Sequence, residues 1–516
     1  MPLNKSHIAP LWYVLPLLVL QLPFAFSPMC VWDSAVQQHL YNTQNLEGAK
    51  KLFFDSSVPL SYYEMLPFAL LPSFVIPFKL AIVFLFSGTT LLIASILRRF
   101  LYFSETEIYF ISVLTFFYPA YALWLHFIML PYYIAFFAFT AALLLLLKYQ
   151  DHPSLKQLPV IVLLLLFAFN IQSFLVLFLA LLFFYFLLSA EFRAACRANM
   201  PVYVFLALLP FIYYFTLNYF FPRAGFYRED GYNTLVLNPL ITGTELAKSL
   251  FNGTLTPLVT FARYLISDPV SSVVYGVAAL LLLLVLKSRI RIEATGKFNL
   301  KYASVFLLLA CVALLPYALV GKHISTHGYE TRHSLLFHTP FLIFIILCSR
   351  LLQRHQKTIL QVALAISFFM FLRQQVLWEN RYMKYEEVIS RIKTMGEDRL
   401  GNVVFFNEGA NRWDMDEYLR FYECNMMLMD AFGNQYRLGI SDMREAHAPH
   451  LVEQYEQKYL KYKSVLFFNG YSHYQKISEL RIEEHPCDDV VLFAATRLNA
   501  SSPCHIRNVL DVTLLP

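Results

Sequence analysis

The sequence has 516 residues, of which 58% are hydrophobic and only 15% are charged, and its mean hydropathy is +0.51. A soluble chain of this length cannot bury so much apolar surface, and globular domains carry about 25% charged residues. The composition therefore excludes an ordinary soluble protein. The net charge of +6 is modest and indicates no nucleic-acid partner, because the cytoplasmic loops of membrane proteins collect Lys and Arg.

Apolar runs long enough to cross a bilayer as a helix, which takes about 20 residues, recur along the chain. They predict about eleven membrane-spanning helices. The first run lacks a small-residue cleavage site, so we expect it to be retained as a span. The predicted spans are 9–27, 75–97, 107–125, 132–147, 158–172, 174–189, 201–220, 270–286, 302–320, 335–352 and 358–376.

Basic residues gather in alternate connections between these spans. Short basic turns mark the cytoplasmic side of a membrane protein. We therefore predict a cytoplasmic N-terminus, and we predict that the C-terminal region and the longer connections 28–74, 221–269 and 321–334 are extracytoplasmic. The basic positions are Arg98 and Arg99, Lys148 and Lys156, Arg193 and Arg197, Lys287 to Lys301, and Arg350 to Lys357.

Two segments do not fit a simple span. Residues 58–74 contain Pro59, Pro67, Pro72 and Glu64, so we interpret them as a helix on the membrane surface. Residues 158–189 are too few for two full spans, and a polar break at 170–173 favours two short helices. Non-helical backbone at membrane depth is tolerated only where it lines a cavity or is buried. The second segment is therefore a candidate wall of a site.

Beyond residue 377 the charged residues become frequent. Apolar runs of strand length at 402–407, 464–469 and 490–495, with helices predicted at 413–430 and 449–463, indicate a small α/β domain over 377–516 after a membrane domain over 1–376. The seven cysteines include no CxxC pair, which argues against a zinc or redox site. Cys487 and Cys504 would be able to pair in an oxidising compartment, and the sequence leaves this open.

The first long connection carries an acidic residue at the membrane boundary, Asp33, followed by an amphipathic stretch from Ala35 to Leu46. A carboxylate at this depth is costly unless it is solvated or paired, so it tends to be functional. The alternative interpretation is that Asp33 caps the helix that begins at Ser34. The residues alone leave both interpretations open.

In the order and spacing of its features, the chain over about residues 9–376 resembles the GT-C class of membrane glycosyltransferases. The similarity is greatest to the group around protein O-mannosyltransferases and lipid A aminoarabinose transferases. The matching positions are Asp33, Pro59-Leu60 before Tyr62-Tyr63, Arg98-Arg99, Tyr118-Pro119 leading to His126 and Leu130-Pro131, and Arg332-His333-Ser334 through Pro340.

The resemblance implies a polytopic α-helical membrane protein with a small extracytoplasmic C-terminal domain, in the inner (plasma) membrane. It implies transfer of a sugar from a polyprenyl-phosphate donor to a lipid, glycan or protein acceptor on the periplasmic side. Asp33 is then the candidate base for the acceptor hydroxyl. The candidate partners of the donor phosphate are Arg332, Lys322 and Arg228, and the candidate assisting groups are His333, Glu64, Asn170 and Gln172.

The chain also departs from that family. Asp33 is a single acid where many members have a pair, and Tyr132-Tyr133 follow Pro131 where many have a second acid. Asn170 and Gln172 stand where many have a lysine or arginine. Whether a divalent cation is required is therefore open.

Two other classes remain alternatives. A polysaccharide polymerase or ligase usually has a large late loop with paired arginines, and the late loop here is short. A non-catalytic transporter or flippase usually shows internal repeats and Gly- or Pro-broken helices. We find no repeat, and the chain has only 16 glycines.

Overall fold

The computed structural model describes most of the membrane-spanning region and part of the C-terminal region. Of Asp33 it describes the backbone alone. The described residues are 8–31, 33–42, 44–71, 73–100, 102–224, 235–236, 238–287, 297–325, 329–396, 399–401, 403–407, 419, 421–432, 438–441, 477–485, 487–500 and 502–515.

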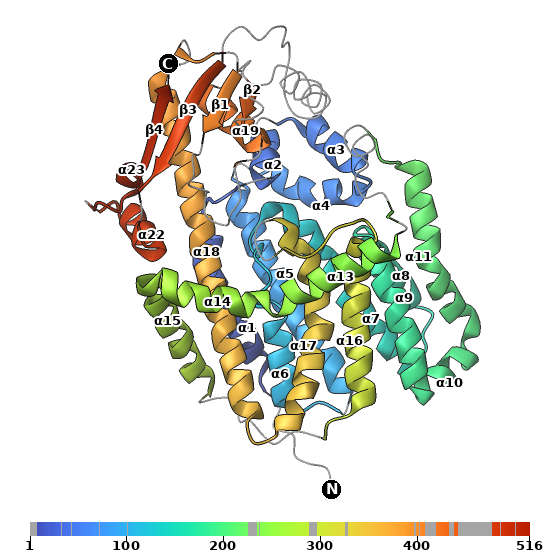
Figure 1. Cartoon of the computed structure of the whole chain (residues 1–516). Helices are drawn as coiled ribbons and strands as arrows, with labels where there is room; N and C mark the ends of the chain where they lie inside the picture. Colours follow the sequence, from blue (N-terminus) through green and yellow to red (C-terminus); the bar gives the residue numbers. More distant parts are fainter. Residues whose placement is uncertain are drawn as a thin grey trace.

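Helices form one bundle, and a small sheet lies at one of its ends (Figure 1). We call this the domain end and the other the opposite end. The helices are α1 Pro10–Ala25, α2 Asp33–Asn42, α3 Leu46–Asp55, α4 Pro59–Ala69, α5 Val75–Arg99, α6 Glu105–Leu114, η1 Phe127–Met129, α7 Leu130–Asp151, α8 Leu158–Phe169, α9 Ser173–Leu188, α10 Ala190–Ala198, α11 Met200–Phe220, α13 Pro239–Thr254, α14 Thr256–Ser267, α15 Pro269–Lys287, α16 Leu300–Ala318, η2 Tyr329–Ser334, α17 Leu335–Ser349, η3 Arg350–Leu352, α18 Gln356–Met395, α19 Phe421–Phe432, α22 Asp489–Arg497 and α23 Ile506–Val509.

Seven helical segments among the described residues are long and apolar enough to cross a membrane, which agrees with a multi-pass helical membrane protein. They contain α5, α7, α11, α15, α16, α17 and α18. The bent pair α9–α10 passes the same test as a unit, whereas α1 and α8 are shorter apolar helices. The predicted number of eleven is therefore matched only in part.

The predicted span 107–125 is wrong in its second half. Helix α6 ends at Leu114, and a buried non-helical stretch follows as far as His126. Pro119 has no N–H for a helix, and side chains bind the free backbone groups instead. Trp124 donates to the carbonyl of Phe116, and Trp378 Nε1 donates to the carbonyl of Ala122 at 2.7 Å. Irregular backbone at this depth is tolerated because protein encloses it.

The break predicted within 158–189 is confirmed, and part of 58–74 forms the predicted helix. Helices α8 and α9 meet at the break 170–172, and α4 is a separate helix of 11 residues. The connection 221–269 contains two helices that the sequence analysis treated as loop. Figure 1 shows α13 and α14 running across the bundle, roughly perpendicular to α16 and α18.

The described part of the C-terminal region contains a four-stranded sheet in the order β2-β1-β3-β4. Strand β1 (Val403–Asn407) is parallel to β2 (Leu438–Ile440) and to β3 (Ile477–Glu484), and β4 (Leu510–Leu515) is antiparallel to β3. The strand predicted at 402–407 is confirmed as β1. The segments 464–469 and 449–463 lie outside the described residues, and of 413–430 only the last part is described, as α19.

The strand predicted at 490–495 is wrong, because these residues form helix α22. A short apolar run fits a strand or a helix equally well, and tertiary contacts decide. The first turn of α22 docks on the membrane helices: Val490 N donates to Ser271 Oγ at 3.1 Å, and Asn380 Nδ2 donates to the carbonyl of Asp489 at 3.0 Å. A disulfide between Cys487 and Cys504 closes the segment that carries α22.

Helix α18 joins the two regions, because it continues unbroken past residue 377 to Met395 (Figure 1). Three charged side chains within about one and a half turns of its domain end pair with C-terminal elements. Glu379 binds Arg497 of α22, Arg381 lies 3.1 Å from Glu423 of α19, and Lys384 lies 2.6 Å from Glu484 of β3. These α18 side chains are buried, so the pairs fix the register of the C-terminal region on the bundle.

Candidate functional site

Polar side chains from four separate elements meet at the domain end of the bundle. We call them the domain-end cluster. Its members lie on α4, on the α8–α9 break, on α13 and in the stretch from α16 to η2. They are Ser61, Glu64, Asn170, Ser173, Glu245, Lys248, Tyr317, Lys322, His323, Glu330, Arg332 and His333.

The η2 part of the cluster holds Arg332 and His333. Both side chains are buried, at 5% and 2% exposure. Glu330 contacts both: its carboxylate lies 3.7 Å from Arg332 Nη2 and 3.1 Å from His333 Nδ1. The imidazole of His333 stacks on Tyr317, with ring centroids 4.2 Å apart. Tyr317 in turn donates from its hydroxyl to Ser173 Oγ at 3.2 Å, which links η2 to the start of α9.

A second Glu–His pair joins α13 to the loop after α16. Glu245 accepts from Lys248 Nζ at 2.7 Å and lies 2.6 Å from His323 Nδ1. Burial raises the pKa of Glu245, but the hydrogen bonds from Lys248 and His323 outweigh it, so the net shift of this pKa is downward. The carbonyl of His323 lies 3.4 Å from His333 Nδ1, which connects the two pairs. Glu245 is therefore held as a carboxylate.

The α8–α9 break contributes Asn170, which is completely buried. Its Nδ2 donates to Ser61 Oγ of α4 at 2.8 Å, and its Oδ1 has no hydrogen-bond partner among the described residues. Glu64 lies one turn after Ser61 on α4, and neither of its buried carboxylate oxygens has a partner there either. Burial raises the pKa of Glu64 to about 8. A buried carboxyl without a partner is therefore mostly protonated at neutral pH.

Glu64 should make the stability of the protein depend on pH. The unfolded chain loses this proton near pH 4.5 and the folded chain keeps it to about pH 8, so raising the pH across that window lowers stability. The slope is at most about 1.4 kcal/mol per pH unit. We expect Glu64→Gln to unfold at a higher temperature than wild type at pH 8 and at a similar temperature at pH 4.5. Glu47→Gln, at the start of α3, is the control. Parallel curves for wild type and Glu64→Gln would mean that Glu64 is ionised in the folded protein.

The structure brings together most of the candidates that the sequence analysis named. Arg332, Lys322 and His333 lie at the end of α16 and in η2, and Asn170 and Glu64 lie beside them through Ser173 and Ser61. Gln172 is at the N-cap of α9, where its side chain makes no capping hydrogen bond. Arg228 lies outside the described residues.

Asp33 is the first residue of α2, and its side chain lies outside the described residues. Its neighbour Ser34 is buried and accepts at Oγ from Ile128 N at 3.3 Å. The helix N-terminus that carries Asp33 is therefore packed against η1. Helix α2 begins at Asp33, one residue earlier than the cap interpretation places it, and the base interpretation stays untested.

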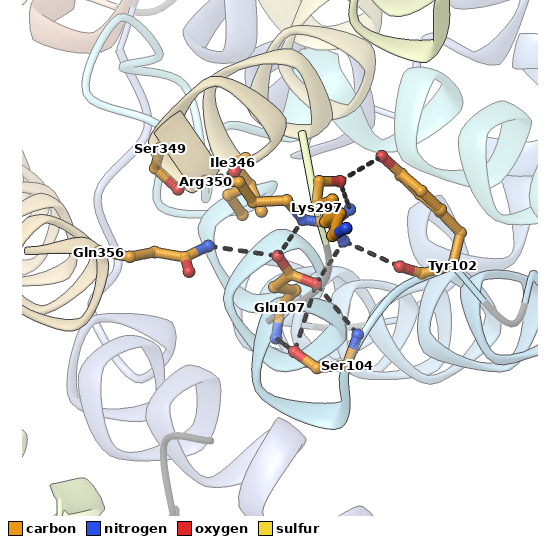
Figure 2. A network of polar contacts seen from close by, with 8 residues as sticks. All are labelled: Tyr102, Ser104, Glu107, Lys297, Ile346, Ser349, Arg350 and Gln356. Carbon is orange, nitrogen blue, oxygen red and sulfur yellow. Dashed lines mark hydrogen bonds and ion pairs between the residues drawn. The ribbon is translucent and has the colours of Figure 1, made fainter. Parts of the chain in front are cut away.

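A different polar network lies at the opposite end and is built around a buried ion pair (Figure 2). Arg350 donates to both oxygens of Glu107 at 2.7 Å and also to the carbonyls of Tyr102 and Lys297. Gln356 and Ser104 complete the bonds of the carboxylate. Both charged side chains are completely buried, and their bonds are taken up inside the protein. This network ties α6, α17 and α18 together.

The sequence analysis did not identify several members of the domain-end cluster. Glu245 and Lys248 lie in a segment interpreted as loop, although its amphipathic spacing from 239 to 254 indicates a helix. Ser61 and Tyr317 carry no signal of their own, because only the tertiary contacts single them out. Among the residues that the structure describes, no group of three or more His, Cys, Asp or Glu side chains is arranged to hold a metal ion.

Comparison with known proteins adds no assignment. No protein-family model matches the chain, and no curated protein matches it in sequence.

Proposed function

We propose that the protein is a membrane glycosyltransferase that moves a sugar from a polyprenyl-phosphate donor to a lipid, glycan or protein acceptor. The observation that carries the proposal is the domain-end cluster. It gathers Arg332, Lys322 and His333 around the end of a span, beside hydrogen-bonding groups such as Asn170. Guanidinium and ammonium groups stabilise a leaving phosphate, and a membrane boundary is where a lipid phosphate lies.

The reaction assigned to this site joins the acceptor oxygen to the anomeric carbon and breaks the bond from that carbon to the phosphate oxygen. Asp33 takes the acceptor hydroxyl proton. Arg332 and Lys322 stabilise the negative charge that develops on the leaving lipid phosphate. Glu330 positions Arg332 and His333, since it contacts both.

Two observations support an extracytoplasmic position for the site, in an inner (plasma) membrane. The Cys487–Cys504 disulfide lies at the domain end, and disulfides persist in oxidising compartments. Basic residues end helices at the opposite end, for example Arg98 and Arg99 in α5 and Lys148 in α7.

The test is sugar transfer by the purified full chain in detergent, with a lipid extract of the source organism as the donor pool. We expect Arg332→Gln to lower kcat/KM by about 10- to 100-fold, because a hydrogen bond to a charged group is worth about 1.5–3 kcal/mol. Arg332→Lys should recover part of the loss. Arg263→Gln, an exposed cation on α14, is the matched control and should leave the rate unchanged.

If Arg332→Gln stays folded and as active as Arg263→Gln, the donor phosphate is not bound at η2. If wild type transfers no sugar but moves labelled lipid across a vesicle membrane, the protein is a flippase and the proposal is wrong.

A further inference from the structure

A large cavity lies inside the bundle, between α5 and α7 on one side and α9, α16 and α17 on the other. Its volume is about 1030 Å³, at the upper limit of the range usual for small-molecule pockets. Most of its lining is aliphatic or aromatic. A cavity of this size and polarity fits a lipid chain better than a polar solute.

The polarity of the lining changes from one end of the bundle to the other. At the opposite end it is polar and charged, with Arg99 and Asp151 at the ends of α5 and α7 and Glu191 at the start of α10. Towards the domain end it consists of residues such as Phe136, Leu177 and Leu336. The two threonines in the lining are already engaged: Thr140 donates to the carbonyl of Phe136 at 3.0 Å, and Thr339 lies 3.3 Å from Thr115 Oγ1.

The charged rim contains one cation and two carboxylates. Arg99 Nη1 lies 2.6 Å from Asp151 Oδ2, and these side chains are 33% and 49% exposed. The guanidinium has five donors, so it is able to bind a phosphate while it keeps this ion pair. Asp151 and Glu191 both line this rim, so carboxylates able to bind an ammonium group lie there beside the guanidinium.

We propose that this cavity binds a phospholipid from the leaflet at the opposite end, with an amine-bearing zwitterionic head group at the rim. Arg99 binds the phosphate, and Asp151 and Glu191 bind the primary amine. An acyl chain fills the space between α5, α7, α9, α16 and α17. This lipid is a resident of the fold and not a reactant.

The position of the charges separates this lipid from the sugar donor. A donor whose phosphate is bound by Arg332 has its head group at the domain end, where the cavity lining is apolar. The head group that the lining fits lies at the other end. The inference therefore does not depend on the proposed sugar transfer.

Native mass spectrometry of the delipidated full chain tests the inference, with added phosphatidylethanolamine, phosphatidylcholine and phosphatidylglycerol of identical acyl chains. We expect the ethanolamine lipid to bind about fivefold more tightly than the glycerol lipid, which corresponds to the contribution of about 1 kcal/mol from one exposed ion pair. Choline should lie between them, because it is cationic but has no N–H donor.

Two sets of variants locate the binding. Asp151→Asn combined with Glu191→Gln should remove the preference for ethanolamine, whereas Glu47→Gln at the domain end should not. Leu143→Trp combined with Leu181→Trp fills the cavity and should reduce the binding of all three lipids. Leu208→Trp on the exposed face of α11 is the matched control and should bind as wild type does.

Equal binding of the three head groups by wild type would overturn the proposal, as would unchanged binding by the cavity-filling variant. An isoprenyl phosphate that displaces the phospholipid one for one would also overturn it, because the cavity would then hold the donor chain. The readout is binding, so failure here is distinct from failure of sugar transfer.

Discussion

Replacing Asp33 by Asn is expected to lower sugar transfer by about two orders of magnitude or more. General-base catalysis is typically worth about 10²- to 10⁴-fold, and the amide keeps the shape of the carboxylate but does not take up the acceptor proton. The measurement is kcat of the purified variant against wild type, with the same lipid pool as for Arg332→Gln. Glu47→Gln provides the control, because Glu47 lies in the first turn of the neighbouring helix α3.

The Asn variant also separates the two interpretations of Asp33. Aspartate and asparagine cap a helix about equally well, so the substitution leaves a capping role intact. We therefore expect the thermal stability of Asp33→Asn to match that of wild type while its activity is lost. Full activity with unchanged stability would show that Asp33 is only a cap, and Glu64 would be the next residue to test as the base.

Breaking the Glu107–Arg350 pair should have the largest effect on stability. Arg350→Met leaves the Glu107 carboxylate completely buried and without its cation (Figure 2). Removing one partner of a buried pair typically costs about 3–5 kcal/mol. Denaturant unfolding of the protein in detergent micelles measures the change. Lys51→Met breaks an i,i+4 pair on α3 in which the lysine is 42% exposed, and this control should cost at most about 1 kcal/mol.

A second variant distinguishes lost pairing from lost packing. Glu107→Leu combined with Arg350→Met replaces both charges with apolar groups, so no buried charge remains unpaired. We expect this double variant to regain most of the lost stability, since apolar replacement of a buried pair is often neutral or better. If Arg350→Met alone costs no more than Lys51→Met, the pair does not hold α6 and α17 together as inferred.

The membrane-spanning helices were predictable because their signal is local. A run of apolar residues must lie in lipid or in a core whatever surrounds it, so α5, α11, α15 and α16 begin and end close to their predicted limits. The break at Asn170 was predictable for the same reason, because polar residues interrupt the run. Strand β1 also follows from its own apolar pattern.

The errors fall where local patterns are ambiguous. The stretch after Leu114 is as apolar as a span, yet Pro119 and side-chain bonds to the backbone end the helix. The run 490–495 is long enough for a strand or two turns of helix, and docking on Ser271 and Asn380 selects the helix. In both places, contacts between residues distant in sequence decide the structure.

The sequence by itself determined the class of protein, the approximate limits of most spans and the list of candidate polar residues. These features were predictable because hydropathy and charge are properties of single residues and do not depend on the tertiary structure. Only the tertiary structure decided that His333 stacks on Tyr317, that Glu245 pairs with His323, and that Asn170 meets Ser61. Those contacts join residues separated by up to 109 positions, as in the Asn170–Ser61 bond, and such pairings follow from how the helices pack rather than from any local pattern.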